Sequence, residues 1–270
     1  MRKAAIRIGL VVCGVVFLVA VWNIVSILLA YRQGEQLYTE TAEQYVQEAT
    51  EPTQQAEAAE DAAQSSALTP EAVDTVTETA EPPISVDFDS LQAVNPEVVG
   101  WLYCADTAIN YPVLQGTDNE YYLHHLYDGT YNSSGSIFVD CNNSADFADA
   151  NTILYGHHMR NGSMFAGLQK FADQTYYEEH PVMWLLTPEK NYKILLVSGY
   201  TTSADSDTYT IFPQPDQAWE DYLTQCLAQS DFTAAVDTGG AEKLITLSTC
   251  AYSFEDARYV LHGVMVEVGN

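Results

Sequence analysis

The apolar residues divide the chain into one long N-terminal run and a series of short runs in its second half. Residues 8–30 contain no charged side chain and are almost all apolar. About 20 such residues are needed to cross the hydrocarbon core of a bilayer. The pattern therefore predicts a transmembrane helix over residues 8–30, preceded by a short tail over residues 1–7.

Basic residues stand mainly on one side of this run. Arg2, Lys3 and Arg7 precede it, whereas the chain after Arg32 is acidic over a long stretch. Because basic flanks stay in the cytoplasm, we expect a single-pass protein of the cell membrane with a cytoplasmic N-terminus and an extracytoplasmic remainder. A cleaved signal peptide is the alternative, but its apolar core usually spans only about 7–15 residues.

The next segment, residues 31–85, has the composition of a linker. Residues 33–83 are rich in Glu, Ala, Thr and Gln and contain neither Lys nor Arg. Such a sequence buries too little apolar surface to offset its chain entropy. We expect an acidic stalk, helical around residues 38–46, that lifts the following domain by about 40 Å from the bilayer. A helix-rich segment that binds a partner is the alternative.

Residues 86–270 show the pattern of a folded β domain. Short runs rich in β-branched and aromatic residues are separated by clusters of Gly, Asn, Asp, Ser and Pro, which predicts a mostly β barrel or sandwich with hairpin connections. The runs are SIFVD, NTILYG, VMWLLT, YKILLVSGY, KLITLSTC and RYVLHGVMVEV.

One helix is predicted late in this domain. Trp219, Tyr222, Leu223, Cys226 and Leu227 recur at helical spacing after the segment PQPD. The apolar stripe of this helix should lie on the barrel. In that position Cys226 is a small buried apolar residue rather than a reactive thiol.

Charge and cysteine content exclude several classes of protein. The 37 acidic and 10 basic residues give a net charge of −27. This balance argues against nucleic acid as a partner and against docking on an anionic lipid surface. The five cysteines fit no small disulfide scaffold, and no CxxC or HExxH motif occurs, so we expect neither a metal nor another cofactor. Whether Cys104 and Cys141 form a disulfide stays open.

Three side chains together suggest nucleophilic catalysis. If KLITLSTC and RYVLHGVMVEV are adjacent antiparallel strands, the loop between them brings Cys250 beside Arg258. A free thiol is only a few per cent thiolate at neutral pH and needs a base, which His157 or His158 can supply. Arginine stays charged and offers forked donors to an oxyanion. Taken singly, each has a structural explanation, as a strand-end cysteine, a turn histidine or a surface arginine.

The order of several blocks resembles the class B sortases of Gram-positive bacteria. The blocks are VNPEVVGWLY, INYPVLQGTDNEYYL, GSIFVD, YGHHM followed by GSMF, and TLSTC followed by Arg258. The resemblance covers residues 88–268. It implies a closed eight-stranded β-barrel with N-terminal helices and one late inserted helix.

The same resemblance implies a function and a site. It implies a membrane-anchored cysteine transpeptidase that cleaves a sorting signal similar to Asn-Pro-x-Thr through a thioacyl intermediate and transfers the secreted protein to a peptidoglycan amine. Its catalytic set corresponds here to His157, Cys250 and Arg258. Three further positions correspond to the family's substrate pocket: Asn119, Leu123 and Ser248. Asn119 as a turn residue and Leu123 as helix core remain open alternatives.

Three other functions stay open at this point. A pilus-polymerising sortase would use a pilin lysine as the acceptor, a thiol hydrolase would release the acyl group to water, and an adhesin would not be catalytic. Ala251 and Tyr252 stand where certain class B members carry acidic residues, so an additional catalytic aspartate has no support and the sorting motif stays open.

The remaining polar candidates receive structural roles. His158 is expected to be a structural or rim residue. A structural or surface role is also expected for the other histidines, namely His124, His125, His180 and His262. The Asp- and Asn-rich segment 140–151 lacks the ligand spacing of an EF-hand calcium loop, which predicts a polar surface loop.

Overall fold

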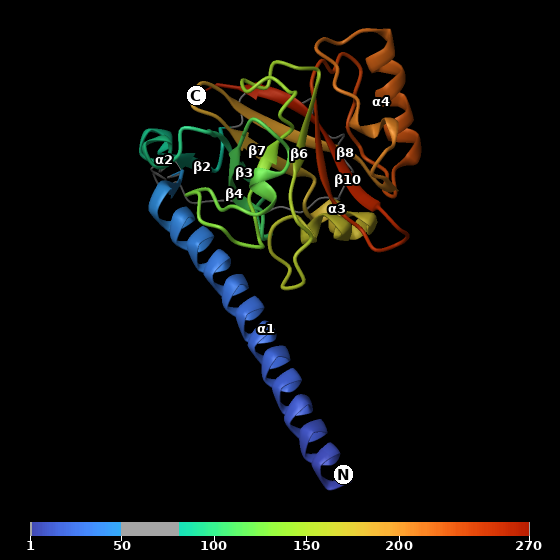
Figure 1. Ribbon diagram of the computed structural model, residues 1–270. Helices are drawn as coiled ribbons and strands as arrows, with labels where there is room; N and C mark the ends of the chain where they lie inside the picture. The colour runs from blue at the N-terminus through green and yellow to red at the C-terminus, as the bar shows by residue number, and fades with distance from the viewer. Residues whose placement is uncertain (1, 50–80, 270) are drawn as a thin grey trace, which may run out of the picture.

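A computed structural model describes residues 2–49 and 81–269 of the chain (Figure 1). Residues 50–80, the larger part of the predicted stalk, lie outside the described residues. The described chain consists of one long N-terminal helix, α1, and a β domain that sits at its C-terminal end (Figure 1).

Eight strands of the domain close into a barrel. Their order around the barrel is β10-β8-β7-β3-β4-β5-β6-β9. This order confirms the predicted eight-stranded barrel and excludes the sandwich. The strands are β3 (Val98–Tyr103), β4 (Asn110–Leu114), β5 (Ile137–Val139), β6 (Asn151–Tyr155), β7 (Val182–Leu186), β8 (Asn191–Ser203), β9 (Leu244–Cys250) and β10 (Ala257–Val268).

Most neighbouring strands are antiparallel, but β4–β5 and β6–β9 are parallel pairs. The β6–β9 pair matters for the site because its two strands end at the same edge of the barrel. Successive side chains of β9 point to opposite faces of the sheet. Ile245 and Leu247 therefore belong to the main hydrophobic core, while Thr246 and Ser248 are buried on the other face.

The helices are short except for α1 and α4. Helix α4 (Gln217–Gln229) is capped at its N-terminus by Asp216, whose carboxylate accepts a hydrogen bond from the Trp219 amide at 3.0 Å. Trp219 and Cys226 of its apolar stripe are buried against the barrel, as predicted. The other short helices are α2 (Phe88–Val94), α3 (Gln174–Glu179) and the 3₁₀ turns η1 (Tyr121–Leu123), η2 (Ala166–Ala172) and η3 (Asp207–Tyr209).

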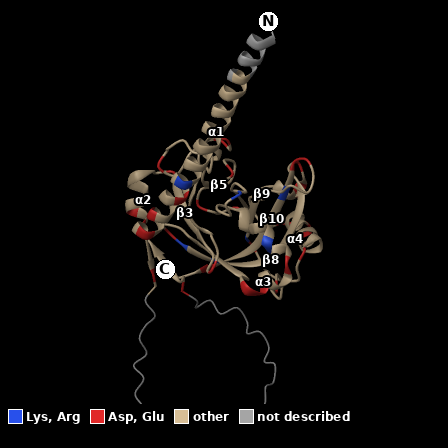
Figure 2. Cartoon of the chain, turned by 90° about the horizontal axis from the view of Figure 1, so that it is seen from below, with Lys and Arg blue, Asp and Glu red and all other residues tan. Residues whose placement is uncertain are grey.

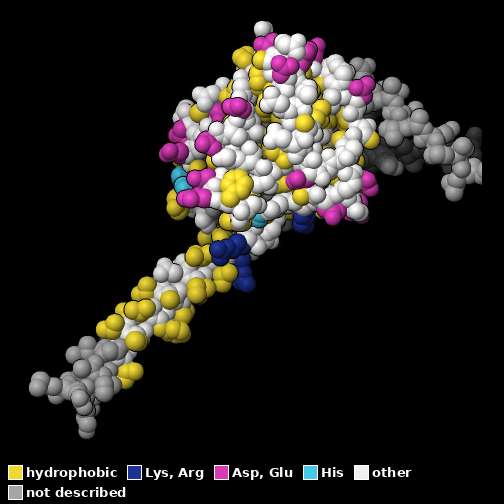
Figure 3. Space-filling model, turned by 90° about the vertical axis from the view of Figure 1, so that its right-hand side faces the viewer, with side chains coloured by type: hydrophobic (Ala, Val, Ile, Leu, Met, Phe, Trp, Pro, Cys, Tyr) yellow, Lys and Arg dark blue, Asp and Glu magenta, His cyan; other side chains and the backbone are white. Residues whose placement is uncertain are grey.

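Helix α1 (Arg2–Tyr45) runs without a break from the apolar stretch into the domain. Within the described residues it is the one helix long and apolar enough to cross a membrane. Figure 3 shows apolar side chains along its free part and basic side chains where the helix meets the domain.

The C-terminal part of α1 belongs to the folded domain, which corrects the predicted start of the stalk. Tyr38, Thr41 and Tyr45 are buried. The short strands β1 (Val46–Glu48) and β2 (Ile84–Val86) then pair with each other. The prediction of a solvated linker over residues 31–85 is therefore wrong for these parts, because a narrow apolar stripe at helical spacing lies within an otherwise acidic composition.

The cysteines of the described chain are all free thiols. Cys104 and Cys226 are buried, whereas Cys141 and Cys250 are partly exposed. Burial raises the pKa of Cys104 to about 11, which makes this thiol unreactive at neutral pH. Cys104 and Cys141 therefore do not pair.

Candidate active site

The cysteine and the arginine lie opposite each other where β9 ends and β10 begins. In the antiparallel β9–β10 ladder Cys250 is the direct partner of Arg258. Directly opposed residues carry their side chains on the same face, with Cβ atoms about 4.5–5.5 Å apart. The ladder is closed by a bond from the Ala251 amide to the Ala257 carbonyl at 2.9 Å. The β register thus places both side chains on the same face of the barrel, and both line the same cavity.

The histidine reaches the same edge through the parallel β6–β9 pair. Tyr155, the last residue of β6, is the partner of Ser248 on β9, and the Gly156 amide donates to the Ser248 carbonyl at 3.2 Å. A Cβ at Gly156 would lie 2.5 Å from Ile137 Cδ1 and 2.7 Å from Phe165 Cδ2, so only glycine fits there. The chain is therefore tightly packed where it leaves β6, and His157 lies next to the end of β9.

A backbone carbonyl orients the His157 ring. Its Nε2 atom lies 2.7 Å from the Leu123 carbonyl oxygen. Because a carbonyl can only accept, Nε2 carries the proton and Nδ1 is left to exchange one. Burial lowers the pKa of His157; the bond to Leu123 opposes this shift, and the nearby His124 adds to it.

His158 points to the backbone of the nucleophile candidate instead. Its Nδ1 atom lies 2.9 Å from the Cys250 carbonyl oxygen, to which it donates. Its ring also makes an edge contact with Tyr252, with centroids 5.3 Å apart. His158 does not line the cavity described next.

A cavity of about 430 Å³ brings all the predicted site residues together. This size is within the range of sites for small molecules and short peptides. The predicted residues that line it are Asn119, Leu123, His157, Ser248, Cys250 and Arg258. The lining residues that sequence reasoning missed are Phe138, Tyr155, Gly156, Ala204, Tyr209 and Thr249.

Tyr209 is the most informative of the missed residues. It lies on η3, and its hydroxyl is 2.8 Å from the Ser248 hydroxyl. Burial raises its pKa, while the Ser248 bond and the charge of Arg258 act in the opposite direction. A tyrosine in a connecting segment far along the chain from Cys250 carries no sequence signal of this contact.

The side-chain amide of Asn119 braces the wall of the cavity. Its Oδ1 accepts from the Cys141 amide at 2.8 Å, and its Nδ2 donates to Asp140 Oδ2 at 2.9 Å. Tyr155 donates to the same Asp140 oxygen at 2.9 Å. Leu123, for its part, both lines the cavity and holds His157 through its carbonyl.

Within the described chain no group of His, Cys, Asp and Glu is arranged to hold a metal ion. The acidic residues are instead spread over many separate segments of the domain (Figure 2). In the Asp- and Asn-rich segment, Asn143 Nδ2 donates to Asp149 Oδ2 at 2.7 Å.

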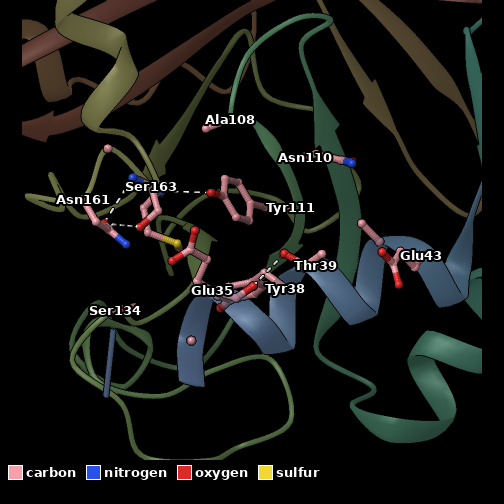
Figure 4. Close-up of a pocket in the computed structure, with 14 residues that line it drawn as sticks. Glu35, Tyr38, Thr39, Glu43, Ala108, Asn110, Tyr111, Ser134, Asn161 and Ser163 are labelled. Atoms are coloured by element: carbon pink, nitrogen blue, oxygen red, sulfur yellow. Dashed lines mark hydrogen bonds between the residues drawn. The ribbon is translucent and has the colours of Figure 1, made fainter. Parts of the chain in front are cut away.

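A second cleft, of about 450 Å³, lies between α1 and the loop after His158 (Figure 4). Glu35 and Tyr38 of α1 face Tyr111 and Ser163 across it. This cleft contains none of the six predicted site residues, all of which line the cavity around Cys250.

Comparison with known proteins finds relatives that are similar in sequence and in fold. The family model described as Sortase domain matches residues 102–266. Sortase B of Listeria monocytogenes is 41% identical over 183 residues, which are 67% of this chain and 74% of that protein. Sortase B of Staphylococcus aureus is 34% identical over 184 residues, 67% of this chain and 75% of that protein. A solved Staphylococcus aureus sortase B–substrate complex is similar with a TM-score of 0.63 and 30% identity, over 67% of this chain and 85% of that chain.

Proposed function

The chain belongs to the sortase family, as a class B sortase and hence a cysteine transpeptidase, and we propose that Cys250 is its nucleophile. In this proposal His157 transfers the protons and Arg258 stabilises the oxyanion. The observation that carries it is the cavity that these three side chains line together, although they come from three separate segments. Cys104 and Cys226, by contrast, are buried away from this cavity.

The first half of the reaction forms a thioester. His157 takes the thiol proton at Nδ1, and the sulfur attacks the threonine carbonyl of a sorting signal similar to Asn-Pro-x-Thr. The negative charge that develops on the carbonyl oxygen faces the Arg258 guanidinium. When the intermediate collapses, the peptide C–N bond breaks and His157 returns the proton to the departing amine.

The second half transfers the acyl group. An amine of a peptidoglycan precursor attacks the thioester carbon, the C–S bond breaks, and the Cys250 thiol is regenerated with a proton from the attacking amine. The product is a secreted protein joined to the cell wall through a new amide bond.

The lining of the cavity supports a peptide as the donor substrate. Phe138, Tyr155 and Leu123 supply apolar and aromatic surface, and the paired hydroxyls of Ser248 and Tyr209 supply polar contacts. The similar Staphylococcus aureus structure is described as a sortase B–substrate complex. By analogy, we assign the recognition of the sorting signal to this cavity, including Asn119.

Helix α1 supports membrane anchoring in the same proposal. Its apolar part is long enough to span a bilayer, and its most apolar stretch is not buried against the rest of the described chain. With the basic residues before it in the cytoplasm, the catalytic domain is extracytoplasmic. Both substrates, a secreted protein and a peptidoglycan precursor, are then present on the same side of the membrane.

Trapping the thioacyl enzyme tests this function. The full chain is incubated with a fluorescent Asn-Pro-x-Thr-type peptide library, and intact-mass spectrometry is expected to find an acyl adduct on Cys250. The adduct should disappear in Cys250→Ala and persist in Cys226→Ala, which removes a buried thiol outside the cavity.

Hydroxylamine then distinguishes the alternative reactions. A transpeptidase should yield the hydroxamate and turn over faster, whereas a thiol hydrolase would show neither effect. A preference for lysine-bearing protein acceptors over wall-peptide amines would indicate a pilus-polymerising sortase. Unchanged behaviour after alkylation of all exposed thiols would indicate a non-catalytic adhesin.

A further inference from the structure

Four rings form an aromatic patch beside the barrel, which we define as Tyr121, His124, His125 and Tyr131. Three of these residues are exposed, and His125 is half-buried. Tyr131 is 72% exposed and Tyr121 is 44% exposed. The rings of Tyr121 and His125 are stacked with centroids 3.9 Å apart, and Tyr131 lies 5.6 Å from His125 and 6.2 Å from His124. Aromatic surface that is exposed and contiguous marks a contact with a partner or a membrane.

The backbone holds this aromatic patch rigidly. A β-bridge joins His125 to Tyr131, and the Asn132 amide donates to the His124 carbonyl at 2.8 Å. The His125 Nδ1 atom also lies 2.8 Å from the Tyr121 carbonyl oxygen, to which it donates. The four rings are therefore presented together as one preformed surface.

The same segment is attached to α1 at the end of the apolar run. Asn132, the residue after Tyr131, donates from Nδ2 to the Ala30 carbonyl at 2.9 Å. One turn later, Gly34 packs so closely that a Cβ there would lie 2.9 Å from Ser134 Oγ. Tyr131 is thus level with the residue at which the apolar run ends.

The aromatic patch also continues to the active-site cavity. The rings of His124 and His157 have centroids 6.3 Å apart. Two ring contacts, from Tyr131 to His124 and from His124 to His157, therefore connect the outer edge of the aromatic patch with the catalytic pocket.

We propose that the aromatic patch lies in the lipid headgroup layer of the membrane that α1 spans, so that the active-site cavity opens at the bilayer surface. This inference rests on the membrane anchoring proposed above. Tyrosine rings combine an apolar body with a polar tip and are enriched at this depth. Arg32, exposed on α1 just after the apolar run, is placed to meet lipid phosphates.

The contact is aromatic rather than electrostatic. Exposed Glu120 and Asp128 lie in the same segment as the aromatic patch, and the chain as a whole carries a net charge of −27. A surface of this charge gains nothing from anionic lipids, so binding should depend on ring insertion and should tolerate salt. Substrates tethered in the membrane would then meet the cavity without a long reach.

Depth-dependent fluorescence quenching tests this placement. The full chain is reconstituted into phosphatidylcholine vesicles with lipids brominated at the upper acyl positions. The tryptophan added by Tyr131→Trp should be quenched at least about twofold more strongly than the one added by Val94→Trp, because interfacial rings lie within reach of these bromines. Val94 is a matched control because it is 48% exposed and lies on α2.

An internal reporter separates failure of the patch from failure of the anchor. Trp22, on the apolar part of α1 and 72% exposed in the protein alone, should be quenched if the helix is inserted, and Trp22→Phe identifies its signal. Quenching of Trp22 combined with equal quenching of the two added tryptophans would overturn the patch and leave the anchor intact. Absence of Trp22 quenching would overturn the anchor and the patch with it. If about 1 M KCl abolished the quenching of the tryptophan in Tyr131→Trp, this would also contradict an aromatic contact.

Discussion

Cys250 and Arg258 are direct partners in the β9–β10 ladder, so the register of a single hairpin places their side chains on the same face of the barrel. Arg258 donates one hydrogen bond from Nη1 to the Ala257 carbonyl at 3.1 Å. This bond orients the guanidinium and leaves its other donors for a substrate oxygen. This relationship leads to the first prediction.

Replacing Arg258 with lysine should keep the fold but impair catalysis. Lysine keeps the charge but loses the planar fork, so we expect kcat/KM for a sorting peptide to fall by roughly 10²–10³-fold, or about 3–4 kcal/mol. Peptide-cleavage kinetics measure this loss. Arg160→Lys is the matched control, because Arg160 is exposed and does not line the cavity, and its rate should be unchanged. Equal rates for wild type and Arg258→Lys would refute the role of this arginine.

The two adjacent histidines should respond differently to replacement by alanine. His157→Ala should be nearly inactive, because it removes the side chain to which we assign proton transfer. His158→Ala should lose only about 2- to 12-fold, or about 0.5–1.5 kcal/mol, because it removes one hydrogen bond to the Cys250 carbonyl. Single-turnover acylation rates measure both effects, and the opposite ranking would assign the acid–base role to His158.

Stability should fall in mild acid because of His262. This ring is fully buried. The Thr246 hydroxyl donates to Asn151 Oδ1 at 2.8 Å, so it can only accept from His262 Nδ1, which lies 3.0 Å away. The other ring nitrogen, Nε2, has no hydrogen-bond partner. Burial lowers the pKa of His262 to about 3, whereas the unfolded value is about 6.5. Below about pH 6.5 the unfolded chain binds the proton more tightly, so the folded state loses stability as the pH falls towards 3.

Urea unfolding at two pH values measures this effect. Between about pH 7.5 and pH 5, His262 should remove about 2 kcal/mol from the free energy of unfolding. The variant His262→Gln is expected to be less stable at neutral pH but to lack this part of the pH dependence. If the variant and wild type lose the same amount on acidification, another group is responsible.

Tyr38 tests whether the end of α1 is part of the folded domain. Its hydroxyl donates to the Gly135 carbonyl at 2.7 Å and lies 2.9 Å from Ser136 Oγ. Tyr38→Phe should therefore lower the free energy of unfolding by about 1–3 kcal/mol, since it leaves buried partners unsatisfied. Thr39→Ala, on the exposed face of the same turn, should change it by less than about 0.5 kcal/mol. Equal effects in denaturant unfolding would mean that α1 is not held by this contact.

Several elements of the fold and one relationship in the site could be predicted from short stretches of the sequence. The apolar run over residues 8–30, the helical stripe of Trp219 and Cys226, and the β runs each follow from periodicity in a short window. The closeness of Cys250 and Arg258 follows from one hairpin, because two adjacent antiparallel strands must bring these ends together.

Other features depend on contacts between distant segments. The pairing of β6 with β9 positions His157, η3 brings Tyr209 to Ser248, and the Leu123 carbonyl selects the His157 tautomer. None of these relationships has a period or a spacing that a single sequence displays. The predicted start of the domain was wrong for the same reason. The few tyrosines of α1 that are buried are recognisable as core residues only once the loop on which they pack is known.

The sequence by itself determined the elements, their apolar faces and the residue types available for chemistry, because these depend on neighbours along the chain. The tertiary structure alone decided which carbonyl holds the histidine, which hydroxyls meet in the cavity and where the helix joins the domain. The physical reason is that these choices come from close packing around a closed barrel, in which each segment is positioned by partners far away in sequence.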